Sequence, residues 1–419
     1  MSVLLLGADY YGTLAAARCL GQRGVKVMVA DETRRARALW SRYTKERLVH
    51  PPLGDARAFM DWLLEFGQAH PRTVVYPTND HLAWLLSARR EEVSRVFSTM
   101  HPDEDTTLSL LDKKRLFSLG SELGIDMPKT WYAETDQDLL SLAQREATFP
   151  LLIKPRTQIY LESGIKGSLI GSRDELAGAL VRYHALVRFN RVLTDRHPDI
   201  DRPMLQAYHK AAETSIFSVS GYVDREHLVS RSAMKILQRP RKIGIGLCFE
   251  EREPEQRIIE QLRVLCKHVG YQGAFEAEFI ADGERRMLID FNPRFYSQMA
   301  FDVARGLPLP YIVYLVAMGD RAAANAELEE AASWAPEGKQ VYCHGFMLDL
   351  VLALQGLSGQ MPRDEVRRWR AWRKDNEARA TDAVRDEGDR LPALIDTASW
   401  IEHFARHPRS FFRSYVLNR

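Results

Sequence analysis

Residues 288–295 read LIDFNPRF, an apolar stretch in which every second position from Asp290 onward is polar. Successive side chains of a β-strand point to opposite faces, so residues two apart lie on the same side. One face would carry the polar side chains of Asp290, Asn292 and Arg294. The other would carry the apolar side chains of Met287, Ile289 and Phe291. The pattern predicts a half-buried strand with a carboxylate, an amide and a guanidinium on its polar face.

The preceding residues 273–287, GAFEAEFIADGERRM, show the same alternation and end in a turn-forming ADGER segment. Glu276 and Glu278 would share one face of this run. We therefore predict a β-hairpin whose polar face collects two or three carboxylates and the Asn292 amide. Hard cations such as Mg²⁺ prefer oxygen ligands of this kind and often share them with substrate phosphates. A solvated outer face of a sheet is the alternative interpretation.

The N-terminal region has the pattern of an α/β domain with a parallel sheet. Its predicted elements are a strand at residues 3–6, a helix at 12–23 and a second strand at 25–31. Residues 73–88 repeat the form and place Asn79 and Asp80 in a loop where open α/β sheets bind ligands. Gly7 and Gly12 do not complete a GxGxxG fingerprint, which makes a Rossmann oxidoreductase the weaker interpretation.

After about residue 105 the predicted strands and helices no longer alternate strictly, which indicates an α+β domain. This region offers Lys113 at the start of a helix, Lys154 at the end of an apolar strand, and the glycine-rich loop LESGIKGSLIGS. A triphosphate needs point-like cations, closely approaching backbone N–H groups and a divalent ion held by carboxylates. No GxxxxGK[ST] motif occurs, so the sequence predicts nucleotide binding without a P-loop.

Several motifs follow one another in a characteristic order: a helix that begins with DK and leads to GIDMP, then PLLIKP, the glycine loop, LQAY, and finally EF and DFNPR. This order resembles the ATP-grasp superfamily over roughly residues 1–320. The resemblance implies ATP held between two α+β subdomains and used to convert a carboxylate into an acyl phosphate, which an amine then attacks. It implies a Rossmann-like α/β domain at 1–105, an ATP-grasp domain at 106–320 and a mainly helical extension at 321–419.

The resemblance also implies roles for individual residues. Lys113 and Lys154 would contact the ATP phosphates, and Lys154 would act in catalysis with Arg294. The flap over the phosphates would consist of Gly164, Gly167 and Ser168. The adenine and ribose would be bound by Gln206, Ala207, Tyr208 and Glu213. The ligands of Mg²⁺, or of Mn²⁺ in its place, would be Glu278, Asp290 and Asn292.

Asp290 stands where the family usually has glutamate, so we expect weaker or rearranged metal binding. Residues 232–251 occupy the place of the substrate-binding segment in carboxylate–amine ligases of this type. Lys235, Arg239 and Arg241 would hold a substrate carboxylate there, with a solvated basic loop as the alternative. We therefore predict an ADP-forming ligase that joins a carboxylate to an amine. The alternatives are carboxylation, phosphorylation of another acceptor, or a non-catalytic nucleotide-binding regulatory protein.

The composition gives no reason to expect a macromolecular partner. The 58 basic and 56 acidic residues leave a net charge of +2, too small to indicate binding to nucleic acid or to an anionic membrane. In the basic run at 367–374, Val366, Trp369 and Trp372 recur at helical spacing, which favours a docked helix over a nucleic-acid patch.

Four scattered cysteines, an N-terminus unlike a signal peptide and short apolar runs favour a soluble, cytoplasmic protein. We expect small-molecule substrates and a homodimer.

Overall fold

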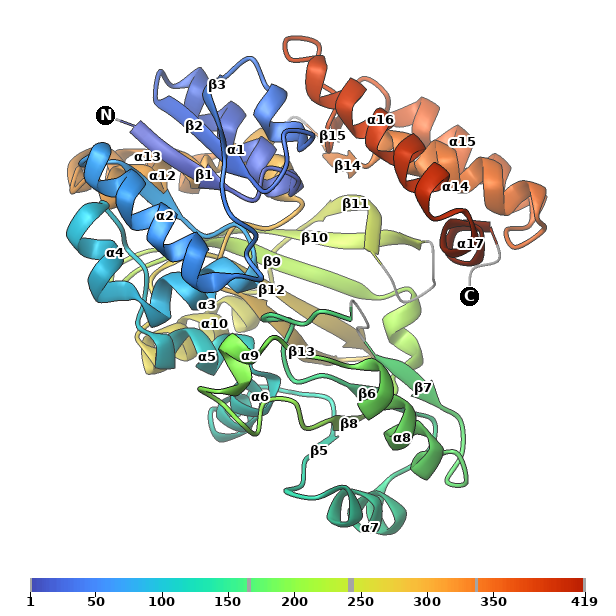
Figure 1. Ribbon diagram of the computed structural model, residues 1–419. Coiled ribbons are helices and arrows are strands. Elements are labelled where there is room, and N and C mark those ends of the chain that lie inside the picture. The colour runs from blue at the N-terminus through green and yellow to red at the C-terminus, as the bar shows by residue number, and fades with distance from the viewer. Residues whose placement is uncertain (1, 164–166, 240–244, 336–337, 417–419) are drawn as a thin grey trace.

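The computed structural model describes residues 2–163, 167–239, 245–335 and 338–416, and three sheets organise this part of the chain (Figure 1). Gly164, Arg241 and the side chain of Arg239, all predicted site residues, lie outside the described part.

Short buried apolar runs form three of the four strands of the first sheet, as the sequence predicts, whereas the edge strand at residues 44–49, TKERLV, is half-exposed and was not predicted. Its four parallel strands are ordered β3 (Thr44–Val49), β2 (Lys26–Asp31), β1 (Ser2–Leu6) and β4 (Val74–Tyr76). Its associated helices are α1 (Tyr11–Gln22), η1 (Arg37–Trp40), α2 (Ala56–Ala69), α3 (Asp80–Ala88), α4 (Arg90–Val96) and α5 (Glu104–Leu111). The strand order reverses between β1 and β4, which creates a topological switch point at their carboxyl ends. There the Thr78 hydroxyl donates a hydrogen bond of 2.6 Å to the Leu6 carbonyl.

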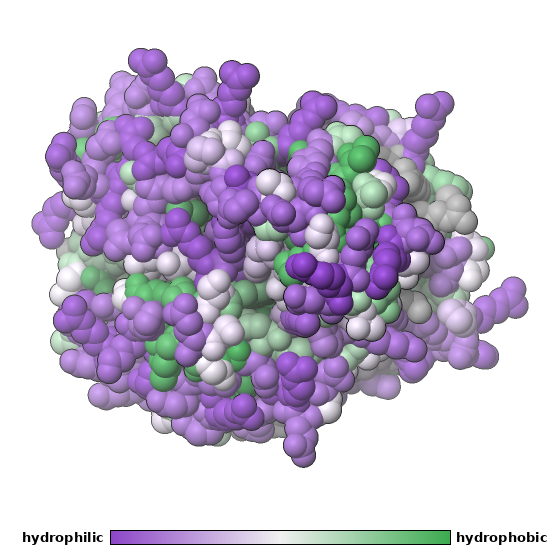
Figure 2. Space-filling model, turned by 90° about the horizontal axis from the view of Figure 1, so that it is seen from below, coloured by the Kyte–Doolittle hydropathy of each residue, from purple (hydrophilic) through white to green (hydrophobic). Residues whose placement is uncertain are grey.

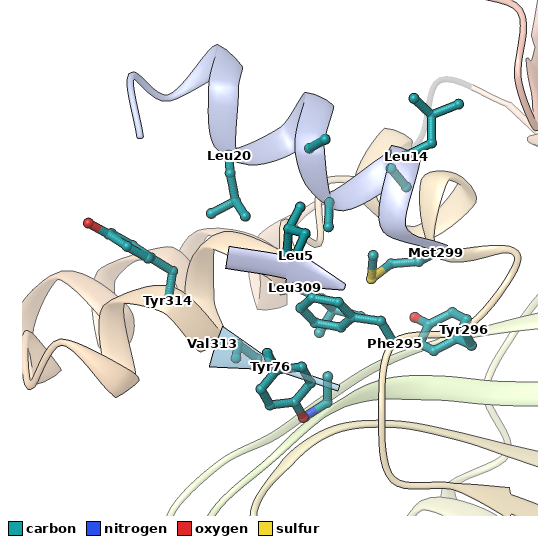
Figure 3. Packing of buried hydrophobic residues seen from close by; sticks show 14 of the residues in the cluster. Leu5, Leu14, Leu20, Tyr76, Phe295, Tyr296, Met299, Leu309, Val313 and Tyr314 are labelled. Carbon is teal, nitrogen blue, oxygen red and sulfur yellow. The ribbon is translucent and has the colours of Figure 1, made fainter. Parts of the chain in front are cut away.

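Helices from late in the chain complete the core of this N-terminal sheet. They are α11 (Met299–Ala304), α12 (Leu309–Ala317) and α13 (Arg321–Ser333). Leu14 of α1, Leu5 of β1 and Leu309 of α12 lie in one buried cluster (Figure 3). A Cβ atom on Gly12 would lie 2.5 Å from the Tyr296 carbonyl oxygen, so only glycine permits this approach of α1 to the chain after β13. Ala324 and Leu328 of α13 belong to the same cluster, so the packing crosses the predicted domain limits at residues 105 and 320.

The central sheet has seven strands and supports the candidate site. Their order is β13 (Arg285–Asn292), β12 (Gly273–Asp282), β9 (Ile216–Val223), β10 (Leu228–Arg239), β11 (Ile245–Arg252), β14 (Val341–Cys343) and β15 (Ala380–Asp382). All neighbours are antiparallel except β14 and β15. Helix α10 (Gln256–Val269) buries Ile258 and Leu262 against Phe275 and Phe279 on one face. The opposite face is left for the polar side chains of β12 and β13.

The predicted hairpin is confirmed, with Glu278 opposite Asp290 across β12 and β13. The predicted alternation is wrong in one respect. A β-bulge pairs Phe279 with Leu288, so Ile289 is an extra residue in β13. Because of this shift Leu288 joins the core, whereas Ile289 packs on the side of the carboxylates.

The third sheet lies at the lower end of the molecule in Figure 1. Its antiparallel strands are ordered β5 (Thr130–Trp131), β8 (Met204–Ala207), β6 (Leu151–Lys154) and β7 (Ser168–Ile170). The helices of this region are α6 (Lys113–Glu122), α7 (Asp136–Glu146), α8 (Leu176–Leu186) and α9 (Arg191–Thr194). The mixture of antiparallel strands and helices agrees with the predicted α+β character.

The C-terminal region is mainly helical and also contributes β14 and β15 to the central sheet. Its helices are α14 (Gly345–Leu357), α15 (Arg363–Asn376), α16 (Leu391–Arg406) and α17 (Pro408–Phe411). Val366 and Trp369 of α15 are buried, and Trp372 packs beside them. The docked-helix interpretation of this basic run is confirmed.

Hydrophilic side chains predominate on the face drawn in Figure 2, and the hydrophobic ones are divided into separate patches. Within the described ranges, helices long and apolar enough to cross a membrane are absent. All four cysteines are buried free thiols.

Asp389 fastens the C-terminal region to the N-terminal sheet domain. Its buried carboxylate accepts hydrogen bonds from Arg18 Nε at 2.9 Å, Ser41 Oγ at 2.7 Å and the Arg42 backbone N–H at 2.8 Å. The Asp389 carboxylate therefore stabilises the fold, because its removal would leave each of these donors without a hydrogen-bond partner.

We predict that Asp389→Ala lowers the free energy of unfolding by about 3–5 kcal/mol, because it leaves the Arg18 guanidinium buried without a counter-charge. The midpoint of thermal unfolding should fall accordingly. Glu402→Gln is the control, since the side chains of the Arg35–Glu402 pair are 66% and 33% exposed and such pairs contribute at most about 1 kcal/mol. Equal midpoints for the two variants would contradict the role given to Asp389.

Candidate active site

Three carboxylates and an amide meet on the open face of the β12–β13 hairpin. Glu276 lies opposite Asn292, and Glu278 lies opposite Asp290. Asn292 Nδ2 donates to one Glu276 oxygen at 3.0 Å, and Gln298 Nε2 donates to the other. Glu276 is thus a central member of the cluster, although only Glu278 was singled out from β12 as a metal ligand. The alternation that places Glu278 on this face also places Glu276 there.

Each predicted metal-binding carboxylate forms an ion pair with a lysine. Lys113, the first residue of α6, pairs with Asp290, and Lys235 of β10 pairs with Glu278. Both lysine side chains are at least nine-tenths buried, so their charges need these partners. Lys235 therefore lies among the predicted metal ligands, in a strand, and not in the loop expected for residues 232–251. The described parts of that segment form the antiparallel strands β10 and β11.

Lys154 ends β6 and extends from the third sheet, where its ammonium donates to Gln206 Oε1 at 3.2 Å. Burial, together with the positive charge of Lys113, lowers the pKa of Lys154 to about 8. Asp290 and Glu278 are close enough to oppose this shift. The two predicted phosphate-binding lysines are therefore brought together, although 40 intervening residues separate them in sequence.

Electrostatic effects divide the carboxylates into two kinds. Burial and the negative charge of Glu278 raise the pKa of Glu276 to about 8. Burial alone would raise the pKa of Asp290, but the hydrogen-bonded Lys113 ammonium brings it below its ordinary value. Near neutral pH the cluster thus holds a largely protonated Glu276 beside an ionised Asp290.

Arg294 connects this cluster to the switch point of the N-terminal sheet. Its Nε pairs with Asp80 at the start of α3, and its Nη2 donates to Asn292 Oδ1 at 2.8 Å. Burial opposes the charged form, but Asp80 more than compensates and raises the pKa of Arg294. The pairing with Asp80, which is distant in sequence, was not anticipated.

Three of the residues predicted to bind the adenine and ribose have hydrogen-bond partners within the chain. The Ala207 N–H donates to the Lys129 carbonyl at 2.8 Å and the Tyr208 N–H to the Pro150 carbonyl at 3.4 Å, so both amides are used within the chain. Glu213 ends the turn η2 (Lys210–Glu213) and accepts a 2.6 Å hydrogen bond from the Tyr208 hydroxyl.

Part of the predicted flap lies beside Lys154. Ser168 begins strand β7 and is not in a loop. Gly167 has a φ of +144°, and a Cβ there would lie 2.9 Å from the Ile153 carbonyl and 3.2 Å from Lys154 Cγ. Glycine is therefore required where the chain passes over the lysine.

An apolar patch lies next to the carboxylates on the same face. It consists of Ala212, Ile216, Ile280 and Met287, with Ala211 and Ile289 packed against it. The β-bulge brings Met287 and Ile289 to this side, which strict alternation would have assigned to the core. The site thus has a charged part and an apolar part.

The oxygen donors suit a hard divalent cation if asparagine is included. Among the described residues, the His, Cys, Asp and Glu side chains form no group of three placed to hold a metal ion on their own. Glu278, Asp290 and Asn292 would therefore need further oxygen ligands from a bound molecule.

A cavity of about 430 Å³ lies elsewhere, on α5 and α6. Its charged wall includes Asp112, Lys114, Arg115, Arg156 and Asp199. None of the predicted site residues lines it. Ion pairing favours the charged forms of Arg156 and Asp199 in its wall, whereas Lys154 and Glu276 in the carboxylate–lysine cluster have pKa values of about 8. We therefore assign the chemistry to the cluster.

We predict that Lys154→Met stabilises the folded chain at pH 7 while abolishing activity. The folded-state pKa of about 8 lies below the ordinary 10.5, so the stability linked to this group is present above pH 10.5 and lost as the pH falls through 8. Below pH 8 the buried charge costs about 3 kcal/mol, which methionine avoids.

Urea unfolding at several pH values tests this. The free energy of unfolding of Lys154→Met should exceed that of the wild type below pH 8, and this difference should shrink as the pH rises from 8 to 10.5. Lys129→Met is the control, because Lys129 is 61% exposed and its loss should give no such pH-dependent difference. A constant difference for Lys154→Met at all pH values would contradict the prediction.

No family model matches the chain. A curated relative is the arginine-specific carbamoyl phosphate synthase large chain of Halalkalibacterium halodurans, 22% identical over 219 residues. The match covers 52% of this chain but only 20% of that much longer protein.

Two solved structures share the architecture. The L-amino acid ligase of Bacillus licheniformis superposes with a TM-score of 0.60 at 12% identity, covering 81% of this chain and 79% of the ligase. The biotin carboxylase domain of 2-oxoglutarate carboxylase from Hydrogenobacter thermophilus gives a TM-score of 0.57 at 16% identity, covering 82% and 74%. The chain therefore has the fold of the ATP-grasp superfamily, which its motifs indicate.

Proposed function

We propose that this protein is an ATP-dependent ligase that activates a carboxylate as an acyl phosphate and joins it to an amine, releasing ADP and phosphate. One observation carries the proposal. One cluster of charges combines residues from distant parts of the chain: Lys113, Lys154, the hairpin residues Glu278 and Asp290, and Arg294. A cluster of this composition complements a metal-bound triphosphate.

The paired charges can exchange partners when ATP binds. Lys113 would turn from Asp290 toward the phosphates, and Glu278, Asp290 and Asn292 would bind Mg²⁺. The metal would neutralise phosphate charge during transfer.

Arg294 would act at the acceptor end of the site. Its guanidinium lies between Asn292 and Asp80, so it faces both the predicted metal ligands and the switch point of the N-terminal sheet. A fixed guanidinium there stabilises the negative charge that develops on the transferred phosphoryl group and the acceptor carboxylate. The loops at the switch point would then hold the substrates.

Carboxylation through bicarbonate is the second candidate. The Hydrogenobacter structure contains MgADP, ADP and bicarbonate, and its domain shares this fold. Bicarbonate accepts a phosphoryl group through an oxygen atom, as a carboxylate does, so the same charges would suit either reaction. We also propose that the substrates are small molecules. The cytoplasmic location and the homodimer stay predictions.

To test the activity, the protein is incubated with Mg-ATP and pools of carboxylates, amines and bicarbonate, and ADP, AMP and phosphate are followed. ADP and phosphate that require both a carboxylate and an amine support the ligase, and a requirement for bicarbonate supports carboxylation. Arg294→Lys keeps the charge but loses the planar fork, so kcat should fall roughly 10²–10³-fold. Arg285→Lys, at a side chain that is 54% exposed, should retain full activity. Release of AMP would exclude the acyl-phosphate route.

Asp290→Asn should weaken the binding of Mg²⁺, because an amide carries no charge to offset that of the metal. We expect the Mg²⁺ concentration for half-maximal ADP release to rise by at least the roughly 10–100-fold typical of lost outer-shell partners. Asp282→Asn on the neighbouring strand, 50% exposed and paired with His209, is the matched control. Identical Mg²⁺ titrations for Asp290→Asn and the wild type would rule out Asp290 as a ligand.

A further inference from the structure

We infer that the buried Asp112–Arg156 ion pair is a positioning pair that sets the separation of Lys113 and Lys154. This role rests on the proposed function, in which both lysines bind the phosphates of ATP. Asp112 immediately precedes Lys113, and Arg156 follows Lys154 by two residues. Neither member was singled out from the sequence.

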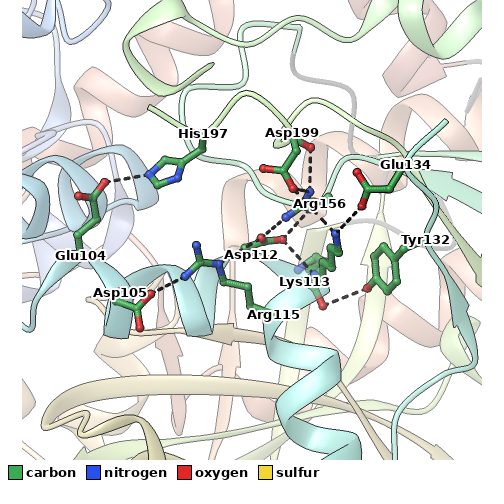
Figure 4. Close-up of polar contacts among 11 residues, drawn as sticks. Glu104, Asp105, Asp112, Lys113, Arg115, Tyr132, Glu134, Arg156, His197 and Asp199 are labelled. Carbon is green, nitrogen blue, oxygen red and sulfur yellow. Dashed lines mark hydrogen bonds and ion pairs between the residues drawn. The ribbon is translucent and has the colours of Figure 1, made fainter. Parts of the chain in front are cut away.

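The pair joins the N-cap of α6 to the segment that follows β6, through side chains and backbone. Asp112 Oδ1 accepts from Arg156 Nε at 3.0 Å, and its other oxygen pairs with Arg156 Nη2 (Figure 4). The Lys113 N–H donates to the Arg156 carbonyl at 2.9 Å. The bidentate contact and the backbone bond close a ring, so Lys113 cannot move along β6 without breaking one of them.

Further bonds hold each member in place. The Asp112 carboxylate caps α6 by accepting from the Lys114 N–H at 3.0 Å. Arg156 Nη1 donates to the backbone carbonyl and to Oδ2 of Asp199, both at 2.8 Å. The Tyr132 hydroxyl donates to the Lys113 carbonyl at 3.1 Å, which fixes the first turn from the other side.

Burying the charges of Asp112 and Arg156 costs desolvation free energy, so a role in packing alone does not account for the pair. The side chains of Arg156 and Asp112 are 5% and 1% exposed. Apolar residues of similar volume often replace such pairs without loss of stability, whereas a bidentate pair fixes one geometry. Lys113 and Lys154 both need a fixed geometry, because two cations must face the same phosphates. Asp112 and Arg156 would act through these lysines and are not catalytic residues themselves.

Two conservative variants separate positioning from simple structural support. Asp112→Asn keeps the helix cap but loses the charge, and Arg156→Lys keeps the charge but loses the bidentate fork. The ligand-free variants are treated with an amine-acylating reagent, and labelling of each lysine is measured by mass spectrometry. Lys129, 61% exposed, is the internal reference. Arg196→Gln, which removes a 51% exposed partner of Glu104, is the control variant.

We expect labelling to change several-fold at Lys113 and Lys154 alone, and kcat/KM for ATP to fall about tenfold, the equivalent of one charge-assisted hydrogen bond. Unchanged labelling in both variants, or a uniform rise at all lysines, would overturn the inference. If a single variant does not fold, Asp112→Asn with Arg156→Gln removes both charges together and is judged by the same labelling. A wild type that binds no Mg-ATP would overturn the proposed function, and the labelling pattern would still decide on the pair.

Discussion

Pairing of buried charges is the constraint on which the site depends. Lys113 pairs with Asp290, Lys235 with Glu278, and Arg294 with Asp80. Each pair joins elements that are far apart in sequence, and a buried charge left without its partner would cost several kcal/mol. These pairs therefore determine which helix, which hairpin and which loop of the N-terminal sheet meet at one place.

The same constraint makes the site responsive to a charged ligand. The mutual repulsion of three neighbouring carboxylates is reduced because Glu276 keeps its proton up to a pH of about 8. Lys154 is held near the point of losing its proton, so an approaching phosphate would favour its charged form. Once the charges have exchanged partners on binding, they need little further reorganisation during a reaction.

The sequence predicted those parts of the site that follow from local periodicity. The alternation around Glu278 and Asp290 identified the hairpin and its polar face, and apolar runs identified β1, β2 and β4 but not the more polar edge strand β3. An inserted residue changes the register without changing composition, so the β-bulge at Ile289 was missed. Long-range partners such as Asp80 for Arg294 leave no local pattern at all. The use of the Ala207 and Tyr208 amides within the third sheet depends on strand neighbours, which motif spacing does not specify.

The core of the N-terminal sheet includes Leu309 and Val313, which pack against Leu5 and Leu14. The ribosome synthesises the first four strands long before it reaches these helices. Until α12 has emerged, the sheet must expose the apolar surface that α12 later covers. The N-terminal sheet is thus synthesised before the helices that complete its core, and its native packing has to wait for them.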